Sequence, residues 1–507
     1  MSTQAVLSPS GSATAFTPNY SRIRFQKPDD IERLYPLLTS YVRSPSRAKN
    51  VSEIVIDLGY WSYFGFSVFP HEEQVQEMVV DENIRDEFHI QLQDYVRGLD
   101  FDDNTTTRFI QSLDWKQRQM TGAWQGPGSK RKRENFQFGI TAIVLLLSLC
   151  DNISTLYLGE SLRQKPILNY MVKGNYREIK NSPLQNLKNV RFITSYMSDE
   201  RNYGRIEILE YIQLIHRLPA LESVAMDAIQ EYQADRMFFI PGTGNIKRME
   251  ITHCDISGEF LATMISIPKA LEELKLSMGG LWSRDGGGPL IRPFHVGIAL
   301  SAYKDSLRVL DIDIDNVGND TGEYGWDPTE EDNLDIDEEE RNWLMNRQLD
   351  KYGRNRITMD KAISTAVEKS PMKDYGRTIG SLHDFPRLTH LSISIMTLLG
   401  SYGNWQTPCR LLKTAPFRLV DGLPPSLEHL CIYGYVRGDN PDVDGHIDEL
   451  LSKKAEKLPR LKVIKGVYEH VQGLKDIFDG YRLDEQDLYV RKEFDLGWKV
   501  MDEPGRI

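Results

Sequence analysis

The chain has 507 residues, of which 40% are hydrophobic and 26% are charged, so it has enough apolar side chains to bury a large core. Its formal net charge of −12 argues against nucleic-acid binding, which depends on a basic surface facing the phosphates. The longest apolar run, Phe138 to Cys150, covers about 13 residues, whereas a membrane-crossing helix needs about 20. We therefore expect neither a nucleic-acid partner nor a membrane.

The first segment, residues 1–19, is rich in Ser, Ala and Thr and has neither the basic start nor the apolar run of a secretory signal. It is expected to be a disordered tail. Four cysteines lie far apart, at Cys150, Cys254, Cys409 and Cys431, and none forms a C-x-x-C pair. Reduced thiols are therefore expected, and with them a cytoplasmic or nuclear location.

One short pattern recurs along the chain: apolar, two variable residues, apolar, one variable residue, apolar. Its clearest copies are Leu271–Leu276, Leu307–Ile312, Leu388–Ile393 and Leu427–Ile432. This spacing is typical of the strand in a leucine-rich repeat, and it predicts that the middle residues Leu274, Leu310, Leu391 and Leu430 belong to the core.

Weaker copies, in which other apolar residues replace leucine, begin at Val51, Ile153, Leu187, Leu221, Ile246 and Leu461, and the last one ends on Gly466. From Ile153 to Leu307, successive starts are separated by about 25 to 36 residues, somewhat above the usual leucine-rich range of about 20 to 29. Ile208, Leu209, Ile212 and Ile215 recur at helical spacing before Leu221. The repeats are therefore expected to be irregular, each with a helix beside its strand.

Together these patterns predict an α/β fold: a leucine-rich-repeat-like solenoid over residues 20–470. Its parallel strands would line the curved, concave side and its helices the convex side, because no helix and strand pair buries its apolar face alone. Two insertions are expected, at about 76–136 and 318–380, and residues 471–507 would form a C-terminal cap or extension. The acidic run Asp327 to Glu340 is expected either to be solvated or to dock a basic partner.

Side chains alternate across a strand, so the variable residues beside the last apolar positions are expected to face outward. These candidate protein-binding residues are Tyr157, Arg191, Glu250, Thr252, Lys275, Asp311, Asp313, Ser392, Ser394 and Tyr433. Acidic residues predominate near the middle, and the tyrosines are of the type enriched at binding hot spots. The expected partner is a protein that presents a basic segment.

Motifs for other chemistry are weak. Asp311-x-Asp313-x-Asp315 lacks the glycine and the glutamate of a calcium loop, so it is better explained as a strand with its acidic side outward. The tetrad Lys130–Arg133 is interpreted either as a solvated loop or as a nuclear-import signal. No phosphate loop, zinc-protease or hydrolase motif is present. We expect no catalytic residue, cofactor or metal.

Several stretches resemble one protein family, the F-box and leucine-rich-repeat proteins common in filamentous fungi. The likeness lies in Phe138 to Leu158, Ser381 to Leu399, Leu423 to Leu430 and Ile447 to Ile464. In that family an N-terminal F-box docks the adaptor of a cullin-type ubiquitin ligase while the repeats select the substrate. The F-box itself is not recognisable here, although Tyr20–Phe25 looks like what normally follows it.

Three functions therefore stay open. The resemblance implies a substrate-recognition subunit of a ubiquitin ligase, which would bind the adaptor only if an F-box lies upstream. A ligase-independent interaction scaffold is the alternative. An enzyme would require a pocket with convergent titratable groups, and the sequence contains no motif for one. In the first two cases the chain is a non-catalytic protein that binds its partner through the strand face.

Overall fold

A computed structural model of the chain describes residues 19–58, 86–123, 128–159, 165–180, 182–193, 202–231, 239–256, 258–281, 293–314, 378–404, 407–411, 417–473, 489–490 and 494–501. Nearly all of the tail expected at 1–19 and of the insertion expected at 318–380, with its acidic run, lies outside the described residues.

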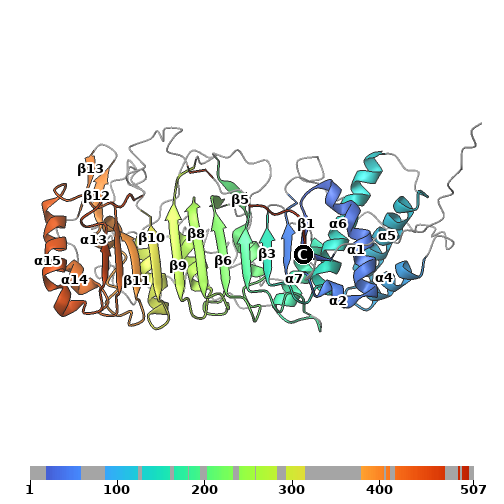
Figure 1. Cartoon of the computed structure of the whole chain (residues 1–507), viewed down its shortest axis with the longest axis horizontal. Coiled ribbons are helices and arrows are strands. Elements are labelled where there is room, and N and C mark those ends of the chain that lie inside the picture. Colours follow the sequence, from blue (N-terminus) through green and yellow to red (C-terminus); the bar gives the residue numbers. More distant parts are fainter. Residues whose placement is uncertain are drawn as a thin grey trace, which may run out of the picture.

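One open sheet of twelve strands runs along the molecule (Figure 1). Its strands, in spatial order, are β15 (Val463–Lys465), β14 (His429–Tyr433), β11 (His390–Ser394), β10 (Val309–Asp313), β9 (Glu273–Met278), β8 (Arg248–Cys254), β6 (Ser223–Asp227), β4 (Asn189–Phe192), β3 (Thr155–Leu158), β2 (Glu53–Ile56), β1 (Tyr20–Phe25) and β16 (Lys499–Val500). Neighbouring strands are parallel, except that β16 is antiparallel to β1. The structure is therefore α/β with a mostly parallel sheet that does not close into a barrel.

The repeat pattern locates strands of this sheet correctly. Its clear copies are β9, β10, β11 and β14, and its weaker copies are β2, β3, β4, β6, β8 and β15. The middle leucines Leu274, Leu310, Leu391 and Leu430 lie opposite one another across the ladder and are fully buried. Their assignment to the core is confirmed. The equal spacing of apolar residues in each repeat produces this row, because parallel strands in register place equivalent residues side by side.

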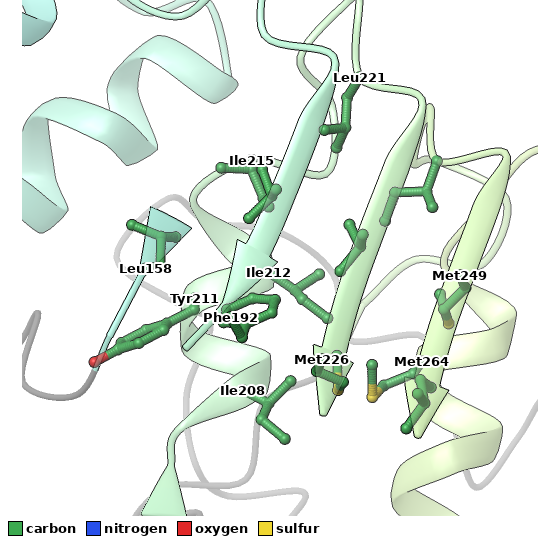
Figure 2. Packing of buried hydrophobic residues seen from close by; sticks show 14 of the residues in the cluster. Leu158, Phe192, Ile208, Tyr211, Ile212, Ile215, Leu221, Met226, Met249 and Met264 are labelled. Carbon is green, nitrogen blue, oxygen red and sulfur yellow. The ribbon is translucent and has the colours of Figure 1, made fainter. Parts of the chain in front are cut away.

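Helices cover the face of the sheet to which these leucines point. They are α7 (Lys165–Asn175), α8 (Ile208–Gln213), α9 (Gly258–Ser266), α10 (Pro293–Leu300) with the 3-10 turn η2 (Ser301–Tyr303), α13 (Ile395–Leu399), α14 (Leu419–Gly422) and α15 (Pro441–Lys457). Figure 2 shows Ile212 of α8 and Met264 of α9 directed at the strand residue Met226, within the main hydrophobic core. Two small sheets accompany them, β5 (Gly204–Ile206) with β7 (Ile229–Glu231) and β12 (Ser401–Asn404) with β13 (Thr407–Leu411).

The first helix, α1 (Pro28–Arg43), shows why the chain turns helical after β1. Pro28 occupies the first turn, where its missing N–H costs nothing, and the Asp30 carboxylate accepts a hydrogen bond from the Lys27 backbone N–H at 2.9 Å. Arg43 lies in the last turn, where the helix dipole favours a cation. A short helix α2 (Pro45–Ala48) then leads into β2.

A layer of helices lies at the β1 end of the sheet. The segment interpreted as an insertion, about 76–136, contains α4 (Glu87–Arg97), α5 (Asp103–Met120) and the start of α6 (Gly128–Leu149), and these helices pack against α1 and one another. The basic tetrad Lys130–Arg133 belongs to α6, so the expectation of a loop there is wrong. Helix α6 begins at Gly128, two residues before the tetrad.

A chain of polar side chains is buried within this helical layer. His89 of α4 has its Nδ1 atom 2.8 Å from the Tyr35 hydroxyl and its Nε2 atom 2.6 Å from the Asp114 carboxylate. Gln93 donates to the same carboxylate from 2.5 Å. His89, Gln93 and Asp114 are buried, so each depends on the others for hydrogen bonds that water does not supply. This network links α1, α4 and α5.

Strand β15, the last copy of the repeat pattern, is followed by Gly466, whose backbone conformation favours glycine. Gly466 has φ of 77°, and a Cβ atom added there would collide with the Ile432 carbonyl of β14. We expect Gly466→Ala to lower the free energy of unfolding by about 1 to 3 kcal/mol. Urea unfolding followed by circular dichroism would measure this. Gly445→Ala, where a Cβ meets no atom, is the control and should not destabilise the protein.

Candidate protein-binding surface

The face of the sheet opposite the helices carries a continuous line of side chains, here called the outward row. Strand register places in it one residue from each of the eight strands β3, β4, β6, β8, β9, β10, β11 and β14: Tyr157, Arg191, Ala225, Glu250, Lys275, Asp311, Ser392 and Cys431. Six of the ten residues expected from the sequence to face a partner are among them: Tyr157, Arg191, Glu250, Lys275, Asp311 and Ser392. Pleat alternation places these six side by side, because each precedes the last apolar residue of its repeat.

The other four expected residues, Thr252, Asp313, Ser394 and Tyr433, lie two positions further along their strands. Two of them are not surface residues, because Thr252 is 5% exposed and Ser394 is 1% exposed. The Thr252 hydroxyl donates to Asp227 at 2.7 Å, and the Ser394 hydroxyl accepts from the Met396 backbone N–H at 3.1 Å as the N-cap of α13. Their assignment as contact residues is therefore corrected. The Ser394 hydroxyl thus caps the helix that begins where β11 ends, and the Thr252 hydroxyl pairs with a side chain of the neighbouring strand β6.

The outward face is hollowed over β3 to β10. A groove of about 750 Å³ is bounded by the outward row and by a second line of side chains two residues earlier in each strand. This second line, which was not predicted from the sequence, includes Thr155, Asn189, Ser223, Arg248, Glu273 and Val309. The repeat pattern could have predicted this second line. The residue before each middle apolar residue must also point outward, because side chains alternate along a strand.

Charged groups across the groove are paired along the sheet rather than isolated. The Lys275 ammonium lies 3.7 Å from the Glu250 carboxylate, and Arg308 lies 3.0 Å from Glu273. All four side chains are at least a third exposed, so these pairs add little to the free energy of unfolding.

Asp311 differs from these surface groups. Burial raises the pKa of its carboxyl above the ordinary value, and the Tyr433 hydroxyl, which donates a hydrogen bond to it at 2.8 Å, opposes that rise. Because this hydrogen bond joins Asp311 and Tyr433 across β11, the acidic and the aromatic side chain cannot contact a ligand independently. A ligand that binds either residue alters the other.

This bond predicts a measurable titration change. Replacing Tyr433 by phenylalanine removes the donor, so the pKa of Asp311 should rise further above its usual value, because the charged form loses its hydrogen bond while burial persists. Carboxyl-carbon NMR of the titrating chain would follow this. Tyr157→Phe, at the far end of the outward row, should leave the Asp311 titration where it was, and an equal shift in both variants would contradict the assignment.

A segment from the C-terminal region, residues 489–490 and 494–501, lies across the outward side and is here called the strap. Its dark red trace ends beside β1 in Figure 1. The Phe494 ring lies 4.8 Å from the Arg191 guanidinium, and Leu496 packs beside Tyr157. Two of the expected contact residues are therefore covered by the chain itself. The expected cap or extension at 471–507 thus includes a segment that returns to the first strand.

None of the helices that the structure describes is both long and apolar enough to cross a membrane. Within the same residues, no group of three or more His, Cys, Asp or Glu side chains is arranged to hold a metal ion. Cys150 and Cys254 are fully buried, and burial raises the pKa of both thiols.

Comparison with known proteins gave no match to a family model, to a curated protein or to a solved structure.

Proposed function

We propose that the chain is a leucine-rich-repeat-like solenoid that binds an extended, basic segment of another protein in the groove over β3 to β10. The observation that carries the proposal is the groove of about 750 Å³ itself, floored by two lines of outward side chains from consecutive parallel strands. Core residues fill the opposite face of the same strands. The outward side chains therefore lie outside the main core, which is typical of a recognition surface.

Charge favours a basic ligand at the uncovered part of this groove. On β8, β9 and β10 the groove is lined by three acidic residues, Glu250, Glu273 and Asp311, and by two basic residues, Arg248 and Lys275. An excess of carboxylates steers a cationic segment toward the surface and raises its association rate. We accordingly assign no chemical step to this surface, and the function proposed is binding.

The resemblance to F-box and leucine-rich-repeat proteins extends the proposal to a substrate-recognition subunit of a cullin-type ubiquitin ligase. The purified chain and the ligase adaptor can be mixed and analysed by size-exclusion chromatography. Co-elution would support the ligase role. Separate elution, with basic-segment binding retained, would instead support a ligase-independent scaffold.

Binding kinetics test the groove directly. A lysine- and arginine-rich peptide of about 12 residues should bind the chain, and an acidic peptide of equal length should not. Glu250→Gln combined with Glu273→Gln should slow association by about three- to tenfold and weaken its dependence on salt, while dissociation changes little. The control pair Asp305→Asn and Asp439→Asn removes two exposed carboxylates elsewhere. Equal association rates for both double variants would refute the proposed site.

A further inference from the structure

Two small hydrophobic clusters outside the main core are completed by the strap. Leu496 packs with Val55 and Ile193, beside Tyr157, and Tyr489 packs against a cluster formed by Tyr203, Ala228 and Leu281. Val55 of β2 lies beside Tyr157 and so continues the outward row by one strand. Most residues of the outward row in the later strands are polar or charged, whereas Val55 is apolar. An apolar side chain at that position needs a cover, and Leu496 supplies it.

Each end of the strap is also held by a carboxylate. The Trp498 indole N–H donates to Asp30 at 2.7 Å, and the Tyr489 hydroxyl donates to Asp227 at 2.7 Å. The Tyr489 ring is stacked on His253 at a centroid distance of 3.6 Å. These are directional contacts between aromatic residues and a polar surface, of the kind that fix the register of a bound peptide.

The backbone of the strap completes the recognition. Strand β16 adds antiparallel to the free edge of β1, the Met501 N–H donates to the Asn19 carbonyl at 2.7 Å, and Arg22 donates to the Asp495 carbonyl at 2.7 Å. Addition of a strand to a sheet edge, with alternate side chains entering pockets, is a recurrent mode of peptide binding. Phe494, Leu496 and Trp498 lie at alternate positions just before β16 and contact Arg191, Tyr157 and Asp30, respectively.

The strap is lightly held compared with the sheet beneath it. Leu496 is 7% exposed, but Phe494 is 39% exposed and Val490 is 69% exposed. A segment with one buried apolar anchor and mostly solvent-facing neighbours opens at a lower free energy than the core. Its docking site can therefore exist without it, because the site's floor belongs to strands that the main core stabilises.

We propose that the surface under the strap is a second peptide-binding site, which takes an extended segment with an aliphatic residue flanked two positions away by aromatic residues, and that the strap occupies it as an internal competitor. A partner with this pattern would replace Phe494, Leu496 and Trp498 in turn and add to the β1 edge. The two sites meet at Tyr157 and Arg191, which also line the groove, but the second site is anchored at Val55, Asp30 and the β1 edge and takes a different ligand, so its test does not require the basic-segment site.

The test uses the full chain and a fluorescein-labelled peptide with the sequence of residues 489–501. In the wild-type chain the strap competes with this peptide. In a Leu496→Ala chain the strap is weakened while every receiving residue is intact, so the peptide should bind at least about 10-fold more tightly by fluorescence anisotropy. Val490→Ala, a change at an exposed position of the same segment, should bind the peptide as the wild type does.

Two further measurements decide the interpretation. Amide hydrogen exchange at residues 499–501 should accelerate in Leu496→Ala and not in Val490→Ala, and the same peptide carrying Leu496→Ala should bind the released chain at least about 10-fold more weakly. Unaccelerated exchange would overturn the role of Leu496 as anchor. Peptide affinity equal to that of the wild type, in a variant with unchanged circular dichroism, would overturn the second site.

Discussion

Replacing Leu310 by alanine is expected to lower the free energy of unfolding by about 2 to 5 kcal/mol, the usual range for truncating a fully buried leucine. Leu310 is fully buried in an interior strand of the sheet, opposite Leu274 on one side and Leu391 on the other. Truncation removes its apolar contacts and leaves a cavity that two neighbouring repeats share. Urea unfolding followed by circular dichroism would measure the loss.

The matched control is the preceding residue of the same strand. Val309→Ala removes two methyl groups from the outward face, where they line the groove, so it should cost less than about 1 kcal/mol. If the two variants unfolded at the same urea concentration, the inward orientation of Leu310 would be contradicted.

Replacing Asp114 by alanine should lower the free energy of unfolding about as much as Leu310→Ala does, but for an electrostatic reason. Asp114→Ala leaves His89 and Gln93 buried without their shared acceptor, and breaking such a buried network costs about 3 to 5 kcal/mol. The control, Asp94→Ala, removes a carboxylate of α4 whose side chain is 64% exposed and pairs with Arg97 at the surface. It should cost less than about 1 kcal/mol. Equal midpoints of thermal unfolding would show that the network does not stabilise the helical layer.

Much of the sheet could be predicted from the sequence because its strands repeat one local pattern. Even degenerate copies, such as those starting at Val51 and Leu461, become strands β2 and β15. Strands β1 and β16 were not predicted. The second is only two residues long, and its pairing depends on a partner far away in the chain, so no local period records it.

The candidate site was predicted only as far as strand alternation holds. Strand alternation aligned Arg191, Glu250 and Lys275 correctly, because each lies within a regular part of the parallel ladder. It misplaced Thr252 because alternation predicts the face of a side chain but not what covers it. Thr252 lies opposite Asp227 of β6 and is buried there, hydrogen-bonded to the same carboxylate that Tyr489 of the strap contacts.

The bond between Tyr433 and Asp311, and the strap, could not be predicted for a different reason. Both depend on which side chains meet across the folded surface. Tyr433 reaches past a whole intervening strand to Asp311, and Trp498 meets Asp30 across 468 positions of sequence. Repeat patterns define the neighbour of each strand, but they contain no information about a segment that leaves the array and returns.

That return has a consequence for biosynthesis. The contact between Ser21 and Lys499 joins residues 478 positions apart, and at about 5 to 20 residues per second a ribosome needs on the order of half a minute to one and a half minutes to make the chain between them. During that interval the outer edge of β1 has no strand beside it, and an unpaired edge is a template for pairing with another chain. Nascent copies on one messenger are therefore most exposed to mispairing at their first strand, which stays open until residues 499 and 500 emerge.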